Sequence, residues 1–291
     1  PEDLWAHLSR YEEITGGQVL AIPHNGNLTM GNMFKLEDSY GQPFSVDYAK
    51  MRARWEPLVE VTQTKGDSET HPLLSPGDEF ADYETWEGYV PEKVDKSLFQ
   101  FEYTRSSLKK GLAVQSNLGI NPFKFGMIGS TDAHTSLSAV AEDNFYGLVS
   151  TNEPKPSRAY GEIVPKYWNR KGVSASGYAA VWAQENTRDS LFAAMKRKEV
   201  YATTGPRMQV RFFGGWHYDV ADAFRADLAT IGNNKGVPMG GDLTSAPKGM
   251  SPNFLIRAVR DPDGANLDRV QVIKGWRTES GELQEKVYDV A

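Results

Sequence analysis

Three polar side chains that could hold one metal ion follow two short apolar runs in this sequence. Asp132 and His134 come directly after the run 125–129 (FGMIG). His24 follows the run 18–22 (QVLAI) in the same way. In an extended segment residues two apart point to the same side, so Asp132 and His134 could reach one ion. A carboxylate and imidazoles suit zinc, manganese or iron, and the pattern therefore predicts a metal site that includes all three residues.

The same residues also allow a structural interpretation. Asp132 and His134 could be ordinary polar residues of a loop after a strand, because short motifs often occur without a site. His24 could be held by hydrogen bonds in the Gly- and Asn-containing turn 23–27 (PHNGN). The metal interpretation gains support because both apolar runs would end at the same edge of a sheet.

Helices and short apolar runs alternate along the first part of the chain. Helical spacing extends from Leu4 to Tyr11 and over 104–118, with Gly16 and Gly119 as the expected stops, and another helix begins near Asn186. The runs that predict buried strands are 18–22, 57–61, 125–129 and 200–203. This alternation predicts an α/β fold with a parallel sheet or barrel, in which sites lie at the carboxyl ends of the strands.

The sequence changes character after residue 207. Three segments rich in β-forming residues follow: 209–213 (QVRFF), 254–259 (FLIRAV) and 269–276 (RVQVIKGW). DPDGAN at 261–266 predicts a turn between the last two. We therefore expect two parts, residues 1–207 with the α/β pattern and residues 208–291 as a β-rich extension that is cut off at its end.

Composition narrows the possible functions. A net charge of −6 without obvious basic clusters argues against a nucleic-acid partner. The absence of cysteine excludes disulfides, thiolate ligands and a thiol nucleophile. No stretch approaches the roughly 18 apolar residues of a membrane span, and no signal peptide is visible. Because the chain starts without methionine, we expect a fragment, and a cytoplasmic or an exported location both stay open.

Further acids and a histidine could add to the site. Glu60 lies in the apolar run 58–61 (LVEV), where a buried acid needs a cation, a donor or a metal as its partner. Glu69 and His71 lie in the long irregular segment 63–90, and such segments inside a domain are often functional. The alternatives are a structural ion pair for Glu60 and a solvated loop for Glu69 and His71.

Around His24 and Asp132 the chain resembles the PHP superfamily (polymerase and histidinol phosphatase). The family's motifs are a strand followed by His-Pro, a strand that carries an acid, and Gly-Ser-Asp-x-His. The matching stretches are 21–25 (AIPHN), 58–61 (LVEV) and 129–134 (GSTDAH). The sequence departs from the family pattern twice, because Asn25 replaces the proline and Thr131 precedes the Asp.

The resemblance is more specific to the Domain of Unknown Function 3604 family. Three stretches carry it: 61–72 (VTQTKGDSETHP), 129–134 (GSTDAH) and 199–207 (EVYATTGPR). The resemblance implies a distorted seven-stranded β/α barrel with two or three metal ions. PHP proteins also carry an early His-x-His motif, which this sequence lacks. The chain would then begin partway through the barrel, and for this fragment both a reduced set of metal ions and an empty, inactive site stay open.

The function that the resemblance implies is hydrolysis of a small-molecule phosphoester by a metal-activated water. His24, Asp132 and His134 would be metal ligands. The possible further ligands or orienting residues are Glu60, Glu69 and His71. The candidate cations for contact with the substrate are Lys65, Arg188 and Arg207.

Two other functions are compatible with the same residues. The site could hydrolyse an amide or a lactone, which needs no cationic pocket. The chain could also be a binding module, in which the β-rich part and the aromatic segment 80–90 recognise a carbohydrate or a partner protein. In that case His24 and Asp132 would be purely structural. The sequence does not indicate an oligomeric state.

Overall fold

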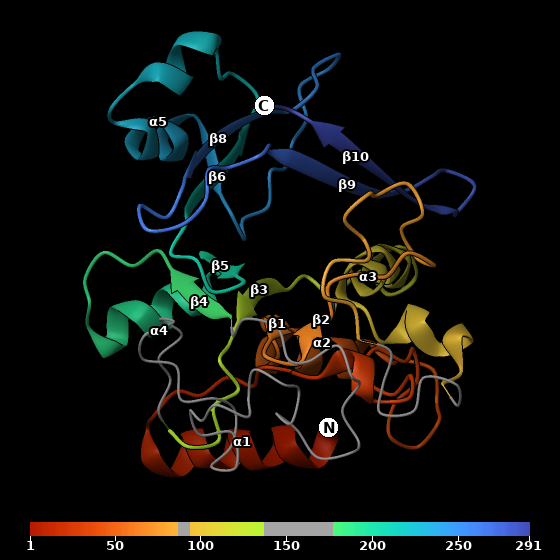
Figure 1. The fold of residues 1–291 in the computed structure, drawn as a ribbon. Coiled ribbons are helices and arrows are strands. Elements are labelled where there is room, and N and C mark those ends of the chain that lie inside the picture. The colour runs from red at the N-terminus through yellow and green to blue at the C-terminus, as the bar shows by residue number, and fades with distance from the viewer. Residues whose placement is uncertain (87–93, 137–176) are drawn as a thin grey trace, which may run out of the picture.

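A computed structural model describes residues 1–86, 94–136 and 177–291 (Figure 1). Its α-helices are α1 (Glu2–Thr15), α2 (Val46–Trp55), α3 (Thr104–Leu118), α4 (Arg188–Lys196) and α5 (Leu228–Lys235). The 3₁₀ helices in these ranges are η1 (Gly26–Leu28), η3 (Lys96–Phe101) and η7 (Val220–Phe224). None of the helices described is long and apolar enough to cross a membrane.

The strands form small separate sheets. They are β1 (Leu58–Gln63), β2 (Gly66–Asp67), β3 (Gly126–Gly129), β4 (Tyr178–Val181), β5 (Val200–Thr203), β6 (Gln209–Gly215), β7 (Gly236–Pro238), β8 (Asn253–Val259), β9 (Gln271–Arg277) and β10 (Leu283–Asp289). The sheet orders are β2-β1-β3, β4-β5, β7-β6-β8 and β10-β9. This mixture agrees with the predicted α/β class, although no sheet in the described ranges closes into a barrel.

The pair β1 and β3 is parallel, as the sequence predicts. Leu58 lies opposite Gly126 and Glu60 opposite Ile128, so both strands end at one edge. A core that includes Val59, Phe123 and other aromatic and aliphatic side chains packs against this sheet. Burial of these side chains fixes the sheet, and with it the edge where the polar residues lie.

The pair β4 and β5 lies beside β3 (Figure 1). The backbone N–H of Gly177 donates to the carbonyl of Ser130 at 2.9 Å, which joins the start of β4 to the end of β3. A Cβ at Gly129 would lie 2.8 Å from the carbonyl oxygens of both Thr203 and Tyr178. Only glycine therefore allows the three strands to approach this closely.

Most elements after residue 208 are strands. In β7-β6-β8 the apolar face packs on α5 through Phe213, Leu228 and Leu255. A Cβ at Gly232 would lie 2.5 Å from the Phe213 ring, so this glycine lets α5 lie directly on the sheet. The hairpin β9–β10 lies beside α3 (Figure 1). The predicted division at residue 207 stays a prediction.

Helix ends follow the predicted glycines, whereas one predicted strand is wrong. Gly16 and Gly119 have left-handed backbones and end α1 and α3. The run 18–22, predicted as a strand, has no strand structure. Its segment makes only isolated backbone bonds, in which the N–H of Ala21 donates to Trp55 and the N–H of Glu60 donates to the carbonyl of Pro23. Pro23, directly after the run, has no N–H to donate, so a regular ladder cannot continue through it.

Candidate functional site

Glu60 and Ser130 meet at the shared end of β1 and β3. The backbone N–H of Ser130 donates to the carbonyl of Thr62 at 3.0 Å and continues the parallel pairing past β3. The Ser130 hydroxyl donates to Oε2 of Glu60. The bond from Glu60 N–H to the Pro23 carbonyl, at 3.0 Å, brings the segment before His24 to the same place. The polar residues that follow the runs 18–22 and 125–129 thus lie near one edge of the sheet.

Asp132 and His134 lie together, as predicted, but for a different reason. His134 Nε2 is 3.2 Å from Asp132 Oδ1. Asp132 has a φ of 49°, in the left-handed region that Asp tolerates better than most residues, so the segment is a turn rather than an extended strand. The side chain of Asp132 is 19 % exposed and that of His134 is 61 % exposed. His134 therefore stands open to solvent over a more buried carboxylate.

Glu60 is the buried acid of this edge, with 6 % of its surface exposed. Burial raises its pKa, while the Ser130 hydroxyl and the charges of Lys65 and His24 lower it and Asp132 raises it. These effects place the three other charged groups within electrostatic reach of Glu60. Its Oε1 has no hydrogen-bond partner in the part of the chain that the structure describes.

Lys65 is a buried cation next to Glu60. It is 4 % exposed. Its Nζ donates to Asn27 Oδ1 at 2.7 Å, and the Asn27 amide N–H donates to the carbonyls of Trp86, at 2.9 Å, and Asp67, at 3.3 Å. Burial lowers the pKa of Lys65 to about 8, although Glu60, Asp67 and Asp132 act to raise it. Burial, together with the charge of Glu69, raises the pKa of Asp67 to about 8.

The backbone explains how a lysine at a hairpin tip becomes buried. Gln63 pairs with Gly66, so Thr64 and Lys65 form the two-residue turn between β1 and β2. Gly66 has a φ of 120°, and a Cβ there would lie 2.2 Å from the carbonyl oxygen of Glu84. The segment that contains Glu84 and Trp86 therefore lies directly on the hairpin.

Glu69 and His71 have partners in other surroundings. Glu69 Oε1 accepts from Arg105 Nε at 2.6 Å, and Arg105 Nη1 also donates to Asp78 Oδ2 at 2.6 Å. His71 is buried, and its ring meets that of Phe99 with centroids 4.8 Å apart. The alternative that these two residues lie in a solvated loop is thus wrong for His71. A part for either residue in a metal site stays a prediction.

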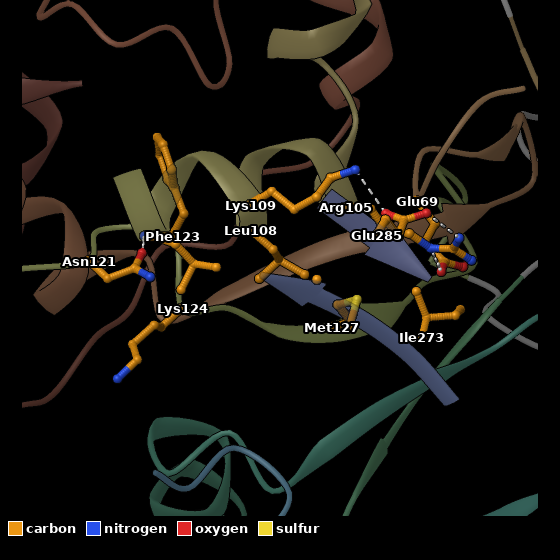
Figure 2. Close-up of a pocket in the computed structure, with 12 residues that line it drawn as sticks. Glu69, Arg105, Leu108, Lys109, Asn121, Phe123, Lys124, Met127, Ile273 and Glu285 are labelled. Carbon is orange, nitrogen blue, oxygen red and sulfur yellow. Dashed lines mark hydrogen bonds and ion pairs between the residues drawn. The ribbon is translucent and has the colours of Figure 1, made fainter. Parts of the chain in front are cut away.

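Arg105 and Lys109 form one cluster of ion pairs with Glu69, Asp78 and Glu285, called the Arg105 cluster below. This cluster borders a cavity of about 340 Å³ between α3 and the β9–β10 hairpin (Figure 2). Figure 2 shows Arg105 between Glu69 and Glu285, with Lys109 reaching Glu285. Leu108 and other apolar side chains form the rest of the wall. Each charged side chain that lines this cavity has an ion-pair partner, Lys124 through Asp242 and the others among themselves, which distinguishes the cavity from the edge at Glu60.

The other predicted cations lie on the surface. Arg188 is the exposed first residue of α4. Arg207 is exposed as well, and its backbone N–H donates to Asp261 Oδ2 at 2.5 Å. Of the three candidates, Lys65 is the one that the structure buries beside Glu60.

The predicted ligands do not form a complete set in this structure. Within residues 1–86, 94–136 and 177–291, no three His, Asp or Glu side chains are arranged to hold one metal ion. Asp132 and His134 do meet, and His24 lies within electrostatic reach of Glu60. The metal site therefore stays a prediction for these residues.

The sequence interpretation missed Asn27, Asp67 and Ser130. Each stands within five residues of a predicted site residue, in PHNGN, KGD and GST respectively. These residues could have been suspected from the sequence, because small polar residues stand next to each predicted ligand. The contact between Asn27 and Lys65 joins positions 38 apart, and no local pattern reveals it.

A family model described as "Protein of unknown function (DUF3604)" matches residues 1–291. No curated protein matches the chain, and no solved structure does.

Proposed function

We propose that this chain, which belongs to the DUF3604 family of unknown function, is a metal-dependent hydrolase of the PHP type that acts on a phosphoester. Its site would be the edge where β1 and β3 end. The proposal includes a distorted β/α barrel, to which the sheets β2-β1-β3 and β4-β5 would belong. The motif resemblance at 21–25, 58–61 and 129–134 supports this assignment.

One observation carries the proposal, namely the incomplete pairing of Glu60. Its side chain is buried, yet Oε1 has no partner among the described residues. Leaving a buried acceptor unpaired costs about 1–3 kcal/mol, and more for a charged group. A cation bound at the edge would satisfy this oxygen and offset the cost.

The donor chemistry of the edge fits a transition metal. His24 and His134 offer imidazole nitrogens, and Asp132 and Glu60 offer carboxylate oxygens, a mixture that suits zinc, manganese or iron. His24, Asp132 and His134 would hold the ion, and Glu60 would bind it or orient a ligand. Such an ion, when bound, lowers the pKa of a coordinated water and polarises a phosphoryl oxygen.

The remaining polar residues of the edge have roles that follow from their contacts. Ser130 donates to Glu60 Oε2 and holds the carboxylate in place. Asn27 fixes the ammonium of Lys65, since the carbonyls of Trp86 and Asp67 fix the Asn27 amide. A buried ammonium attracts an anion more strongly than an exposed one does, because the local dielectric is low. Lys65 therefore favours a phosphoester over a neutral amide or lactone.

Elemental analysis of the purified chain tests the metal part of the proposal. We expect near-stoichiometric zinc, manganese or iron in the wild-type chain and its loss in His24→Ala/Asp132→Ala. The matched control is His217→Ala/Asp263→Ala, an exposed pair away from the edge, which should keep the metal. A metal-free wild-type chain, or a metal retained by the first double variant, would contradict the proposal.

Hydrolysis assays test the substrate class. The metal-loaded chain is offered a phosphomonoester, a phosphodiester, an anilide and a lactone. We expect turnover of a phosphoester that Lys65→Met lowers at least tenfold. Turnover of the anilide or lactone alone would show that the substrate class is wrong while the metal site holds.

A further inference from the structure

A pair of arginines in the β-rich part of the chain has no ion-pair partner among the described residues. Arg211 on β6 lies directly opposite Arg257 on β8 in the antiparallel register. Directly opposite residues point to the same face with their Cβ atoms about 4.5–5.5 Å apart, and like charges in such positions repel. This pair of like charges does not stabilise the sheet unless a negative group neutralises it.

Neither arginine is neutralised by the described residues. No carboxylate among them lies within ion-pair distance of Arg211 or Arg257. Arg257 Nη2 donates to the backbone carbonyl of Arg225 at 2.7 Å, and Arg211 makes no hydrogen bond that the structure records. The carboxylate of Asp227, close by in sequence, is already bound by Arg225, with Nε–Oδ1 at 2.9 Å and Nη2–Oδ2 at 3.1 Å.

The two side chains are held in place by neutral groups. The Arg211 guanidinium lies 3.6 Å from the ring centroid of Trp182, and the Trp182 indole N–H donates to the Val210 carbonyl at 2.9 Å. Partial burial lowers the pKa of Arg211, although Glu199 and Tyr201 act to raise it. The guanidinium is thus positioned by stacking, with its N–H groups left for another partner.

Both arginines line one cavity of about 220 Å³. Trp182 and Gln209 add an aromatic ring and an amide, and α5 contributes its first turn through Leu228 and neighbouring residues. Across the described residues, none of the side chains that line this cavity is acidic. The cavity therefore combines two guanidinium groups with an apolar wall, and the acid that acts on Arg211, Glu199, lies outside the lining and is paired with Arg197 at 2.7 Å.

We propose that this cavity binds the phosphoryl group of a small molecule between Arg211 and Arg257. Planar guanidinium groups bind phosphate oxygens through pairs of parallel hydrogen bonds, and two positive charges match a dianion better than a single carboxylate. Free phosphate and a phosphate monoester share this chemistry.

This site is distinct from the proposed hydrolytic edge. β4 starts beside Ser130, where Gly177 donates to the Ser130 carbonyl, and it ends at Val181. Trp182 follows directly, so the cavity lies at the opposite end of β4 from Glu60 and Asp132. The inference goes beyond the proposed function and does not depend on it.

Calorimetric titration tests the inference, with inorganic phosphate, phenyl phosphate and acetate as probes at constant ionic strength. The metal-free chain is used, both as wild type and as His24→Ala/Asp132→Ala, so that binding at the hydrolytic edge does not contribute. We expect one phosphate per chain and weaker binding of acetate. Tighter binding of phenyl phosphate identifies a phosphomonoester as the ligand class, and equal binding identifies free phosphate.

Variants locate the binding. Arg211→Gln and Arg257→Gln should each weaken phosphate binding at least tenfold, and Arg211→Lys should weaken it less, because it keeps the charge but loses the planar fork. Arg277→Gln, an exposed arginine on β9, is the control and should change binding less than twofold. Circular dichroism checks the fold of each variant.

Thermal unfolding gives a second readout. Phosphate should raise the melting temperature of the wild type and leave that of Arg211→Gln/Arg257→Gln unchanged. The inference fails if the wild type shows no saturable binding, if acetate binds as tightly as phosphate, or if the double variant binds phosphate like the wild type.

Discussion

Two buried clusters of charge in this chain differ in how completely their members are paired. Around Arg105, Nε and Nη1 reach Glu69 and Asp78 at 2.6 Å each, and Lys109 Nζ reaches Glu285 at 3.0 Å. At the end of β1 and among the described residues, Glu60 Oε1 has no partner, and the one hydrogen bond of Lys65 Nζ goes to Asn27 Oδ1.

The difference indicates what each cluster does. The Arg105 cluster links α3 to the β9–β10 hairpin through Glu285, so its charges hold distant segments together and have few free positions for a ligand. The cluster at Glu60 leaves an acceptor and an ammonium with spare bonding capacity. A buried charge that is fully paired serves structure, whereas an incompletely paired one has bonding capacity left for a further partner such as an ion.

Among single substitutions at one pH, the largest expected effect comes from breaking the paired cluster. Arg105→Met leaves Asp78, which is 1 % exposed, without its cation. Removing one partner of a buried ion pair costs about 3–5 kcal/mol. Urea denaturation measures the free energy of unfolding, with Lys35→Met as control, because Lys35 pairs with Glu37 at the surface and such pairs contribute about 0–1 kcal/mol. A loss below about 1 kcal/mol in Arg105→Met would show that the cluster is not structural.

The next effect tests whether the β1–β2 hairpin holds Lys65 in place. In Gly66→Ala the new Cβ would lie 2.2 Å from the Glu84 carbonyl oxygen, at a φ of 120°. We expect a loss of about 2–4 kcal/mol in stability, since both the strained backbone and the clash must be relieved elsewhere. Gly77→Ala is the matched control, because nothing lies within 4 Å of a Cβ there. Equal stability of the two variants would contradict this account of the hairpin.

The comparison also shows what the sequence could predict. The bounds of α3 follow from apolar spacing and from Gly119, and the parallel pairing of β1 with β3 follows from the α/β alternation. Helix α5 is not predicted, because LATIGNNK contains Gly232 and little apolar periodicity, and its position depends on close packing against Phe213. Local patterns thus identify elements with regular spacing, and contacts distant in sequence decide the rest.

The same limit applies to the site. Asp132 and His134 could be predicted to meet because they are two residues apart. Lys65 stands at the tip of a two-residue turn, which normally faces solvent, and its burial depends on the segment that contains Glu84 and Trp86. No pattern within the hairpin indicates that segment.

A third prediction concerns pH. The pKa of Asp67 in the folded chain is about 8, above its ordinary value of 3.8, because of burial and Glu69. The folded state therefore holds a proton that the unfolded state releases, and stability is lost as pH rises from about 4 to 8, with a slope of at most ~1.4 kcal/mol per pH unit. Asp67→Asn should flatten this slope in urea denaturation across that range. An unchanged slope would show that Asp67 titrates normally.

The smallest effect concerns Ser130, which donates to Glu60. Ser130→Ala removes one hydrogen bond, worth about 1 kcal/mol of stability, and raises the pKa of Glu60 further, because the hydroxyl lowers it. If Glu60 binds or orients a metal, we also expect metal affinity to fall by roughly tenfold. Ser97→Ala is the matched control, because the hydroxyl of this exposed serine on η3 also donates to a carboxylate, Asp95 Oδ1 at 2.6 Å, and its loss should leave metal affinity unchanged. If Ser130→Ala bound metal as tightly as the wild type, Ser130 would have no part in the metal site.

The most direct test compares the two clusters within one experiment, a calorimetric titration of the metal-free chain with zinc and with manganese. Glu60→Gln and Glu69→Gln are equivalent changes, one in each cluster. We predict that Glu60→Gln weakens binding of the preferred metal at least tenfold, while Glu69→Gln binds it like the wild type. Equal weakening in both variants, or no saturable binding by the wild type, would contradict the claim that the incompletely paired cluster is the metal site.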